Sequence, residues 1–312
     1  MSGPVAPTDA SPQASAPVPA VGGPALELLP GRSTEVGGVP VVRVLPKRQR
    51  RTVGAWCFVD HFGPADVAVA TMQVGPHPHI GLQTVTWVLD GVVLHRDSLG
   101  SEQLIRPGQL NLMTAGRGVA HAEETPETAS GRLHGLQLWV AQPDPTRFGD
   151  AAFEHHPSLP QAEVGEVRAT VLVGEFAGAR SPARADTPLL GVDLAVTGGS
   201  TLPLDPAFEH GLVVVDGALQ IDDTVISPGV FAYLGLGRDH LRLTGRLQTR
   251  ALLLGGVPFG ETILMWWNFV ARTRAEIDEA AQDWEKGSDR FGEVRSSLAR
   301  ISPPRPQWAA GG

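Results

Sequence analysis

The sequence predicts an all-β protein of two similar antiparallel β modules in tandem, followed by a short C-terminal α-helix. Three observations predict this class. The chain has 37 Gly and 27 Pro but few aromatic residues, a balance typical of short strands joined by tight turns. Alternating apolar segments recur every 8 to 12 residues or so, which is typical of a sandwich or barrel. Turn motifs of the first half also recur in the second, which indicates an internal duplication.

Composition limits the function classes. A length of 312 residues is enough for two compact domains. The net charge of −8 is spread among interspersed acidic and basic residues, so we expect no direct nucleic-acid binding. No apolar run approaches the roughly 18 residues of a membrane span, and residues 1–30 do not resemble a secretory signal. Since the lone Cys57 cannot form an internal disulfide and lies in an apolar stretch, we expect it to be packed, and the protein to be cytoplasmic.

The first module is expected over residues 26–150, after a disordered tail at 1–25 that is rich in Pro, Ala, Ser and Gly. A basic cluster at 47–51 is interpreted as a solvated loop. Residues 84–89 alternate as in a strand and end at Asp90-Gly91, a hairpin signal. A further strand is expected at 136–140, before a Pro-rich break.

The second module is expected over residues 151–260, with strands at 168–173, 190–196, 212–215 and 251–254. Its Val215-Asp216-Gly217 repeats Leu89-Asp90-Gly91, and its Ser227-Pro228-Gly229 repeats Arg106-Pro107-Gly108. The second copy carries only the isolated His210 and His240, so we expect one working site and not two.

The C-terminal segment, residues 261–312, changes to a helical period. Thr273 and Glu276 have the spacing of a capping box, and Gly287 supplies a stop. Between them Ile277, Ala280 and Trp284 fall on one face. A helix of about 12 residues is marginal alone, so it should dock on the β body.

Two short pairs carry the candidate chemistry: His77-Pro78-His79, and His121-Ala122-Glu123. Residues two apart in a strand point to the same face, with Cα atoms about 6.5 Å apart. Two such pairs inside one barrel would form a cage of three imidazoles and a carboxylate. The sequence therefore predicts a metal site with the ligands His77, His79, His121 and Glu123. The donor set admits Fe, Zn, Cu, Ni, Co or Mn, and an octahedral ion would keep two open positions.

Other polar residues near these pairs are considered as alternative ligands or substrate contacts. Glu124 must point away from Glu123 and is interpreted as a solvated charge. His61, His95 and His134 are interpreted as structural histidines or as partners of the ligands, not as ligands. Gln83 is a possible donor to a substrate beside the metal.

Four long motifs resemble the pirin family of the cupin superfamily. They are Trp56-Cys57-Phe58-Val59-Asp60-His61-Phe62-Gly63-Pro64, the stretch from His77 to Trp87, the stretch from Met113 to Glu123, and His134-Gly135-Leu136-Gln137-Leu138-Trp139-Val140. The likeness covers about residues 30 to 290. It implies two tandem antiparallel cupin (jelly-roll-type) β-barrels with one Fe(II) ion in the first barrel, and it carries the family's ligands over to His77, His79, His121 and Glu123. Many relatives have a Glu where this chain has Gln83, which puts the usual substrates in doubt.

Two functions follow from this resemblance. One is a quercetinase-like dioxygenase that opens the ring of a flavonol or other enolic substrate with O2, with Glu123 as ligand and base. The alternative is a non-catalytic, iron-dependent, redox-sensing protein whose partner is another protein. The dioxygenase is the leading hypothesis, and the sequence does not fix the substrate or the oligomer.

Overall fold

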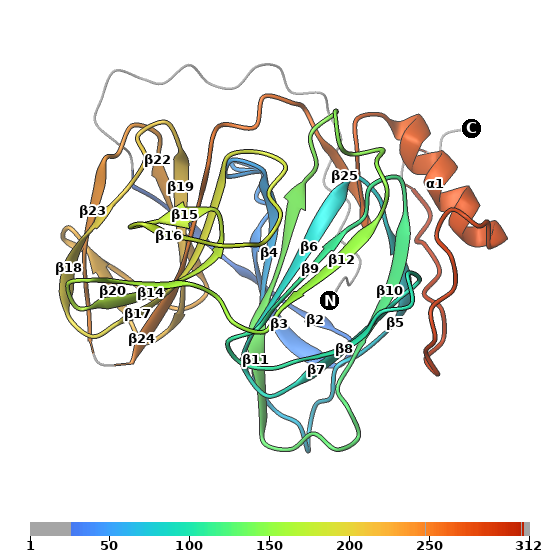
Figure 1. The fold of residues 1–312 in the computed structure, drawn as a ribbon, viewed down its shortest axis with the longest axis horizontal. Helices are drawn as coiled ribbons and strands as arrows, with labels where there is room; N and C mark the ends of the chain where they lie inside the picture. The colour runs from blue at the N-terminus through green and yellow to red at the C-terminus, as the bar shows by residue number, and fades with distance from the viewer. Residues whose placement is uncertain (1–25, 247, 307, 309–312) are drawn as a thin grey trace.

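The computed structural model describes residues 26–246, 248–306 and 308. The tail predicted at 1–25 lies outside these residues. Regular structure in the described part of the chain is β apart from one helix, and Figure 1 shows it as two barrels side by side. None of the described helical structure is long and apolar enough to cross a membrane. The predicted all-β class with two tandem barrels is confirmed.

The first barrel consists of a seven-stranded and a four-stranded antiparallel sheet. The order of the larger sheet is β12-β9-β6-β11-β4-β3-β2, and the order of the smaller is β5-β10-β7-β8. The bounds are β2 (Arg32–Val36), β3 (Val39–Leu45), β4 (Trp56–Asp66), β5 (Gln73–His79), β6 (Leu82–Asp90), β7 (Val93–Asp97), β8 (Glu102–Ile105), β9 (Leu110–Thr114), β10 (Val119–Glu124), β11 (Arg132–Ala141) and β12 (Ala152–His156).

The second barrel repeats this topology strand for strand. Its larger sheet is ordered β1-β22-β19-β24-β17-β14-β13 and its smaller one β18-β23-β20-β21, with a small ribbon of β15 and β16 beside them. This correspondence confirms the predicted duplication. The bounds are β1 (Glu27–Pro30), β13 (Gln161–Val164), β14 (Val167–Val173), β15 (Glu175–Phe176), β16 (Ala179–Arg180), β17 (Leu189–Val196), β18 (Gly199–Pro203), β19 (Glu209–Asp216), β20 (Leu219–Ile221), β21 (Thr224–Ile226), β22 (Val230–Gly235), β23 (His240–Gly245) and β24 (Thr249–Gly256).

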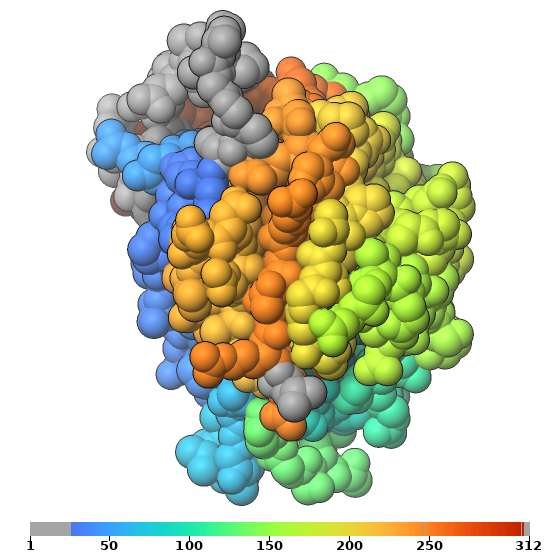
Figure 2. All heavy atoms as spheres, turned by 90° about the vertical axis from the view of Figure 1, so that its left-hand side faces the viewer, coloured from blue at the N-terminus to red at the C-terminus, as the bar shows by residue number. Residues whose placement is uncertain are grey.

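The two barrels exchange an edge strand. β1 precedes the first barrel in the chain but pairs with β22 of the second, and β12 follows the first barrel and pairs with its β9. The predicted boundaries, 26–150 and 151–260, assign β1 to the first barrel and β12 to the second. Each strand instead lies in a sheet of the other barrel. In Figure 2 the blue N-terminal segment lies directly beside the gold strands of the second barrel.

A shared core joins the larger sheets of the two barrels. Trp56 of β4 is fully buried there, and its indole N–H donates to the carbonyls of Leu190 (2.9 Å) and Gly255 (3.3 Å) in the second barrel. The basic cluster also takes part, because Arg50 lies over the ring of Tyr233, with its Cζ 3.7 Å from the ring centroid. The interpretation of residues 47–51 as a solvated loop is therefore wrong for Arg50. Cys57 is buried as predicted, and burial raises the pKa of its thiol to about 12.

The C-terminal segment returns to the first barrel. A hairpin of β25 (Leu264–Trp266) and β26 (Phe269–Ala271) precedes α1 (Arg274–Lys286), which lies on the side of the first barrel away from the second (Figure 1). The predicted helix and its stop are confirmed, since Thr273 accepts from the Glu276 N–H and Gly287 adopts φ of 66°. The capping box is not reciprocal, because the Glu276 carboxylate accepts from the Arg272 N–H at 3.1 Å and pairs with Arg147.

Candidate metal centre

The pairing of β5 with β10 places both predicted pairs on the same inward face of the first barrel. β10 lies beside β5 with His121 opposite His77 and Glu123 opposite Val74, so Gly75 and Pro76 together face one residue. This bulge puts Val74, and not Gly75, on the face that β5 shares with Glu123. Gly75 then turns outward against the C-terminal segment, where a Cβ would lie only 2.1 Å from the Ala299 carbonyl oxygen.

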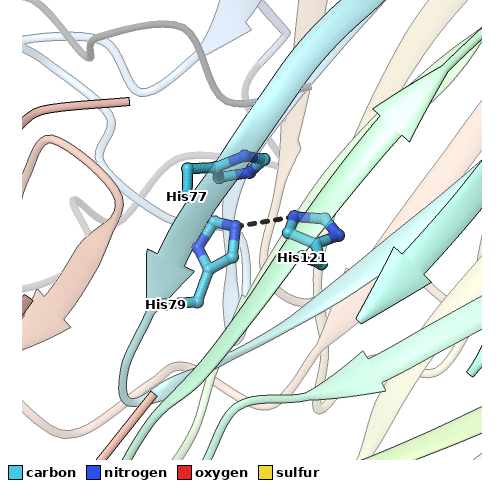
Figure 3. Close-up of side chains that lie close together, drawn as sticks. All are labelled: His77, His79 and His121. Carbon is cyan, nitrogen blue, oxygen red and sulfur yellow. Dashed lines mark hydrogen bonds between the residues drawn. The ribbon is translucent and has the colours of Figure 1, made fainter. Parts of the chain in front are cut away.

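Three imidazoles converge inside the barrel, as Figure 3 shows. The Nε2 atoms of His79 and His121 are 3.0 Å apart. The ring centroids of His77 lie 4.3 Å from His121 and 5.1 Å from His79. One nitrogen from each ring lies within 4.8 Å of the others, and all three side chains are fully buried. This spacing is what three nitrogen ligands of one ion require after a small adjustment.

The outer ring nitrogens of two of these histidines are held by backbone carbonyls. His77 Nδ1 lies 2.8 Å from the Gly75 oxygen, and His79 Nδ1 lies 2.9 Å from the Asn268 oxygen. Since a carbonyl can only accept, each Nδ1 carries the proton and each Nε2 keeps its lone pair for a metal.

Burial keeps the three imidazoles neutral. It lowers the pKa of His77 and His121 well below 6.5, assisted by the neighbouring imidazoles, and it lowers the pKa of His79 to about 3. Neutral imidazole is the form that binds metal.

Glu123 belongs to a second group that overlaps the first. Its carboxylate, His95 and His121 offer atoms within 4.8 Å of one another, so the four predicted ligands fall into two triads that share His121. Glu123 Oε1 lies 3.3 Å from the Thr86 hydroxyl, which lies 2.9 Å from Gln137 Oε1. Imidazole and carboxylate donors in a buried site fit a first-row divalent ion. In the described residues such groups occur in the first barrel only.

The second barrel differs at the corresponding strands. Its β18 and β23 present Leu202, Leu241 and Leu243 to a buried apolar core, where β5 and β10 present imidazoles and a carboxylate. His240 is exposed beside Asp239, and His210 is buried alone on β19. This replacement explains why, among the residues that the structure describes, the candidate centre occurs in the first barrel only.

His95, interpreted from the sequence as a structural histidine or a partner of the ligands, lies beside the centre, together with Asp97, which was not singled out. His95 and Asp97 on β7 stand opposite Glu123 and His121. His95 Nδ1 lies 3.4 Å from His121 Nδ1, and His95 Nε2 lies 3.1 Å from Asp97 Oδ2. The available signal was the same one used for the two predicted pairs, namely two polar residues two apart in a short alternating strand.

The other polar residues considered as alternatives do not lie at the candidate metal centre. His61 and His134 contact each other, with Nε2 atoms 2.6 Å apart. Gln83 shares the face of β6 with Val85 and Trp87, which pack in the core between the barrels, and its amide donates to Thr114 at 3.0 Å. The expectation of a Gln83 amide beside the metal is therefore wrong. Glu124 points away from Glu123 as predicted.

Glu124 is not a solvated charge, however. It is largely buried and accepts from Arg96 (3.2 Å) and from the Ser296 hydroxyl (2.7 Å).

Comparison with known proteins shows which proteins this chain is similar to. A Pseudomonas aeruginosa protein whose name carries a provisional assignment as a quercetin 2,3-dioxygenase is 48% identical over 289 residues, which cover 91% of each chain. A pirin-like protein of Caulobacter vibrioides is 35% identical over 265 residues, covering 82% of this chain and 91% of the relative. A crystal structure of a quercetin 2,3-dioxygenase from Acinetobacter baumannii has a TM-score of 0.87 at 44% identity, covering 90% of this chain and 96% of the other.

Two family models match the chain as well. One, described as Pirin, matches residues 38–140, the region that contains all of the candidate ligands. The other, described as the Pirin C-terminal cupin domain, matches residues 190–292. The chain therefore belongs to the pirin family, and its two barrels are the paired cupin domains of that fold.

Proposed function

We propose that this protein is a mononuclear Fe(II) dioxygenase that opens the ring of a flavonol or a related enolic substrate with O2. The observation that carries the proposal is the convergence of three neutral imidazoles in the buried interior of the first barrel, with the Glu123 carboxylate close to one of them, His121. The relatives named as quercetin 2,3-dioxygenases supply the reaction class.

His77, His79, His121 and Glu123 would hold the ion. An ion bound there would supply Lewis-acid chemistry and a template for substrate and O2. Three neutral imidazoles and one carboxylate leave the centre with a net charge of about +1, which favours an anionic enolate over the neutral enol.

Glu123 is placed to take the proton of the enolic hydroxyl. It is 1% exposed, so it exchanges protons with a bound substrate more readily than with bulk water. Thr86 lies between its Oε1 and Gln137 and restricts its rotation. A carboxylate that acts as a general base in such a setting contributes about 10²- to 10⁴-fold to the rate.

Nearby polar atoms offer contacts for substrate oxygens. The Trp139 indole N–H and both amide atoms of Asn268 are buried, and none of these three atoms has a hydrogen-bond partner among the described residues. Trp139 lies edge-on to His79 with centroids 5.3 Å apart, and the Asn268 carbonyl binds His79 directly. Buried polar groups are normally satisfied, so a hydroxylated ligand beside His79 would complete them.

The test uses protein loaded anaerobically with Fe(II). With quercetin it should consume O2, and Glu123→Gln should reduce the rate at least about 100-fold while retaining most of the iron. Glu124→Gln is the matched control, because the adjacent carboxylate points the other way and should leave the rate unchanged. Uptake by Glu123→Gln at the wild-type rate would rule out the base role.

The absence of O2 uptake by iron-loaded wild type with any flavonol or enol would contradict the dioxygenase. An affinity for a protein partner that changed between the Fe(II) and Fe(III) forms would then support the regulatory function.

A further inference from the structure

A chain of hydrogen-bonding groups runs from Asp97 through His95 to His121. Asp97 Oδ2 lies 3.1 Å from His95 Nε2, and His95 Nδ1 lies 3.4 Å from His121 Nδ1. The other carboxylate oxygen of Asp97 is already committed, since Oδ1 accepts the backbone N–H groups of Leu99 and Ser101, both at 2.9 Å. The Asp97 end of the chain is thereby fixed.

The donors along this chain can be assigned by elimination. An ionised carboxylate only accepts, so His95 Nε2 must carry the proton that faces Asp97. A neutral imidazole has one N–H, so His95 Nδ1 is an acceptor. The proton between the two rings must then sit on His121 Nδ1. The Nε2 lone pair of His121 therefore faces the Nε2 lone pair of His79, 3.0 Å away, and a metal ion between the two nitrogens, not a proton, would satisfy this contact.

The arrangement is held rigidly and is not required by the fold. His95 is 3% exposed and stacks on Phe153 with centroids 4.5 Å apart and an interplanar angle of 13°. The corresponding strand of the second barrel, β20, places the buried Leu219 and Ile221 at its inward positions. The same topology thus forms with two apolar residues there.

We propose that Asp97 and His95 are a positioning pair that fixes the tautomer and ring orientation of His121, so that Nε2 faces the metal. This inference rests on the proposed metal site and adds two residues to it. It gives His121 the equivalent of the carbonyl contacts that hold His77 and His79, so each of the three imidazoles has an outer partner. His95 then acts through His121 and is not itself a ligand.

The first experiment reads the tautomers directly in metal-free protein labelled with ¹⁵N-histidine, by long-range ¹H–¹⁵N correlation. We expect His121 to carry its proton on Nδ1 and His95 to carry its proton on Nε2. The opposite tautomer of His121 would overturn the proposal. Since neither metal nor substrate is present, the result does not depend on whether the protein is a dioxygenase.

The second experiment uses Asp97→Asn to reverse the direction of the hydrogen bonds from residue 97 through His95 to His121. The Asn oxygen must still accept from the Leu99 and Ser101 N–H groups, which turns its NH2 towards His95 Nε2. That nitrogen must then accept, so His95 carries its proton on Nδ1, and His121 must shift its own proton to Nε2. We expect the affinity for Zn(II), measured by competition with a chelator, to fall about 10- to 100-fold.

Two further variants keep the test decisive. Asp239→Asn makes the same change beside the exposed His240 of the second barrel and should leave the affinity unchanged. His95→Phe retains an aromatic ring against Phe153 but offers no acceptor, so it covers the case in which Asp97→Asn fails to fold, and its affinity should fall about 10-fold. Unchanged Zn(II) affinity in a folded Asp97→Asn or His95→Phe would refute the proposal. A fourth coordinated imidazole in the Zn(II) form would also refute it, because His95 would then be a ligand.

Discussion

At the scale of single residues, the first barrel has a row of polar side chains on the inner face of its larger sheet. Arg43, Asp60, Gln137, Thr86 and Asn111 are successive cross-strand neighbours. Thr86 connects this row to Glu123 on the opposite sheet. The far end of the row is a buried ion pair, in which Arg43 donates two hydrogen bonds to Asp60 at 2.8 and 2.7 Å.

This ion pair predicts an asymmetric mutational response. The Asp60 side chain is fully buried, and burial raises the pKa of its carboxyl despite the opposing effect of Arg43. Arg43→Met should therefore lower the free energy of unfolding by about 3–5 kcal/mol at pH 7, because it leaves a buried carboxylate without its cation. Urea denaturation measures this loss.

The controls for this prediction lie within the chain. Arg43→Met combined with Asp60→Asn should recover much of the lost stability, since no uncompensated charge remains. Arg180→Met, which breaks the exposed pair with Glu175, should cost less than about 1 kcal/mol. An equal loss from Arg43→Met and Arg180→Met would show that the buried pair has no special role.

The sequence indicates which side chains share a strand face, but not which face is inside. Because side chains two residues apart in a strand point to the same face, the sequence groups His77 with His79 and His121 with Glu123. The same rule applies equally to His95 with Asp97, and only the sheet pairing shows that this pair also points inward. The expectation for Gln83 was wrong because the local sequence does not show which face of β6 points into the barrel. Gln83 lies on one face, and Thr84 and Thr86 lie on the other.

At the scale of elements, the hairpin of β25 and β26 closes one end of the first barrel. Its turn contains Trp267 at φ of 53°, and Asn268 holds His79 through its carbonyl. The Val270 N–H donates to the Ile80 carbonyl at 3.1 Å, which ties the hairpin to the end of β5. The helix α1 was predictable from its local cap and stop. The contact of Asn268 with His79 was not, because it joins residues 189 apart.

The close approach of this hairpin depends on Gly81. Gly81 has φ of 65°, and a Cβ there would lie 2.1 Å from the Val270 carbonyl oxygen. Gly81→Ala should therefore displace the hairpin, weaken the hold of Asn268 on His79, and lower both the free energy of unfolding and the affinity for Zn(II). Urea denaturation and chelator competition measure the two effects.

Gly287→Ala is the matched control for backbone strain. Its φ of 66° is nearly the same, but its nearest atom is the end of the Arg300 side chain at 3.9 Å. It should cost about 1–2 kcal/mol, the penalty for a left-handed Ala, with unchanged metal affinity. If both variants bound Zn(II) equally well, the hairpin would have no part in holding the centre.

At the scale of the whole molecule, the two duplicated barrels share a topology but differ in the residues that line their interiors. Repeated Asp-Gly and Pro-Gly turns made the duplication predictable, since they end β6 and β19 and precede β9 and β22. The exchange of β1 and β12 was not predictable, because strands of four and five residues carry too little pattern to identify their partners. The exchange and the core around Trp56 bind the apolar second barrel to the polar first one. The second barrel thus adds mainly apolar burial, while the first barrel carries most of the buried titratable groups of the described residues.

Those buried imidazoles predict how stability depends on pH in the metal-free protein. Burial lowers the pKa of His61 to about 4, of His79 to about 3 and of His210 to about 4, whereas an unfolded chain titrates near 6.5. Below pH 6.5 the unfolded chain therefore binds protons that the native state excludes, and the free energy of unfolding must fall as the pH falls. Each imidazole removes about 1.4 kcal/mol per pH unit once the pH is well below 6.5, so these three together remove about 4 kcal/mol per unit. Urea denaturation at pH 7.5 and 5.5 should show the midpoint falling with an unchanged m-value, and a midpoint that stayed constant or rose would mean that the imidazoles are not buried in the neutral form.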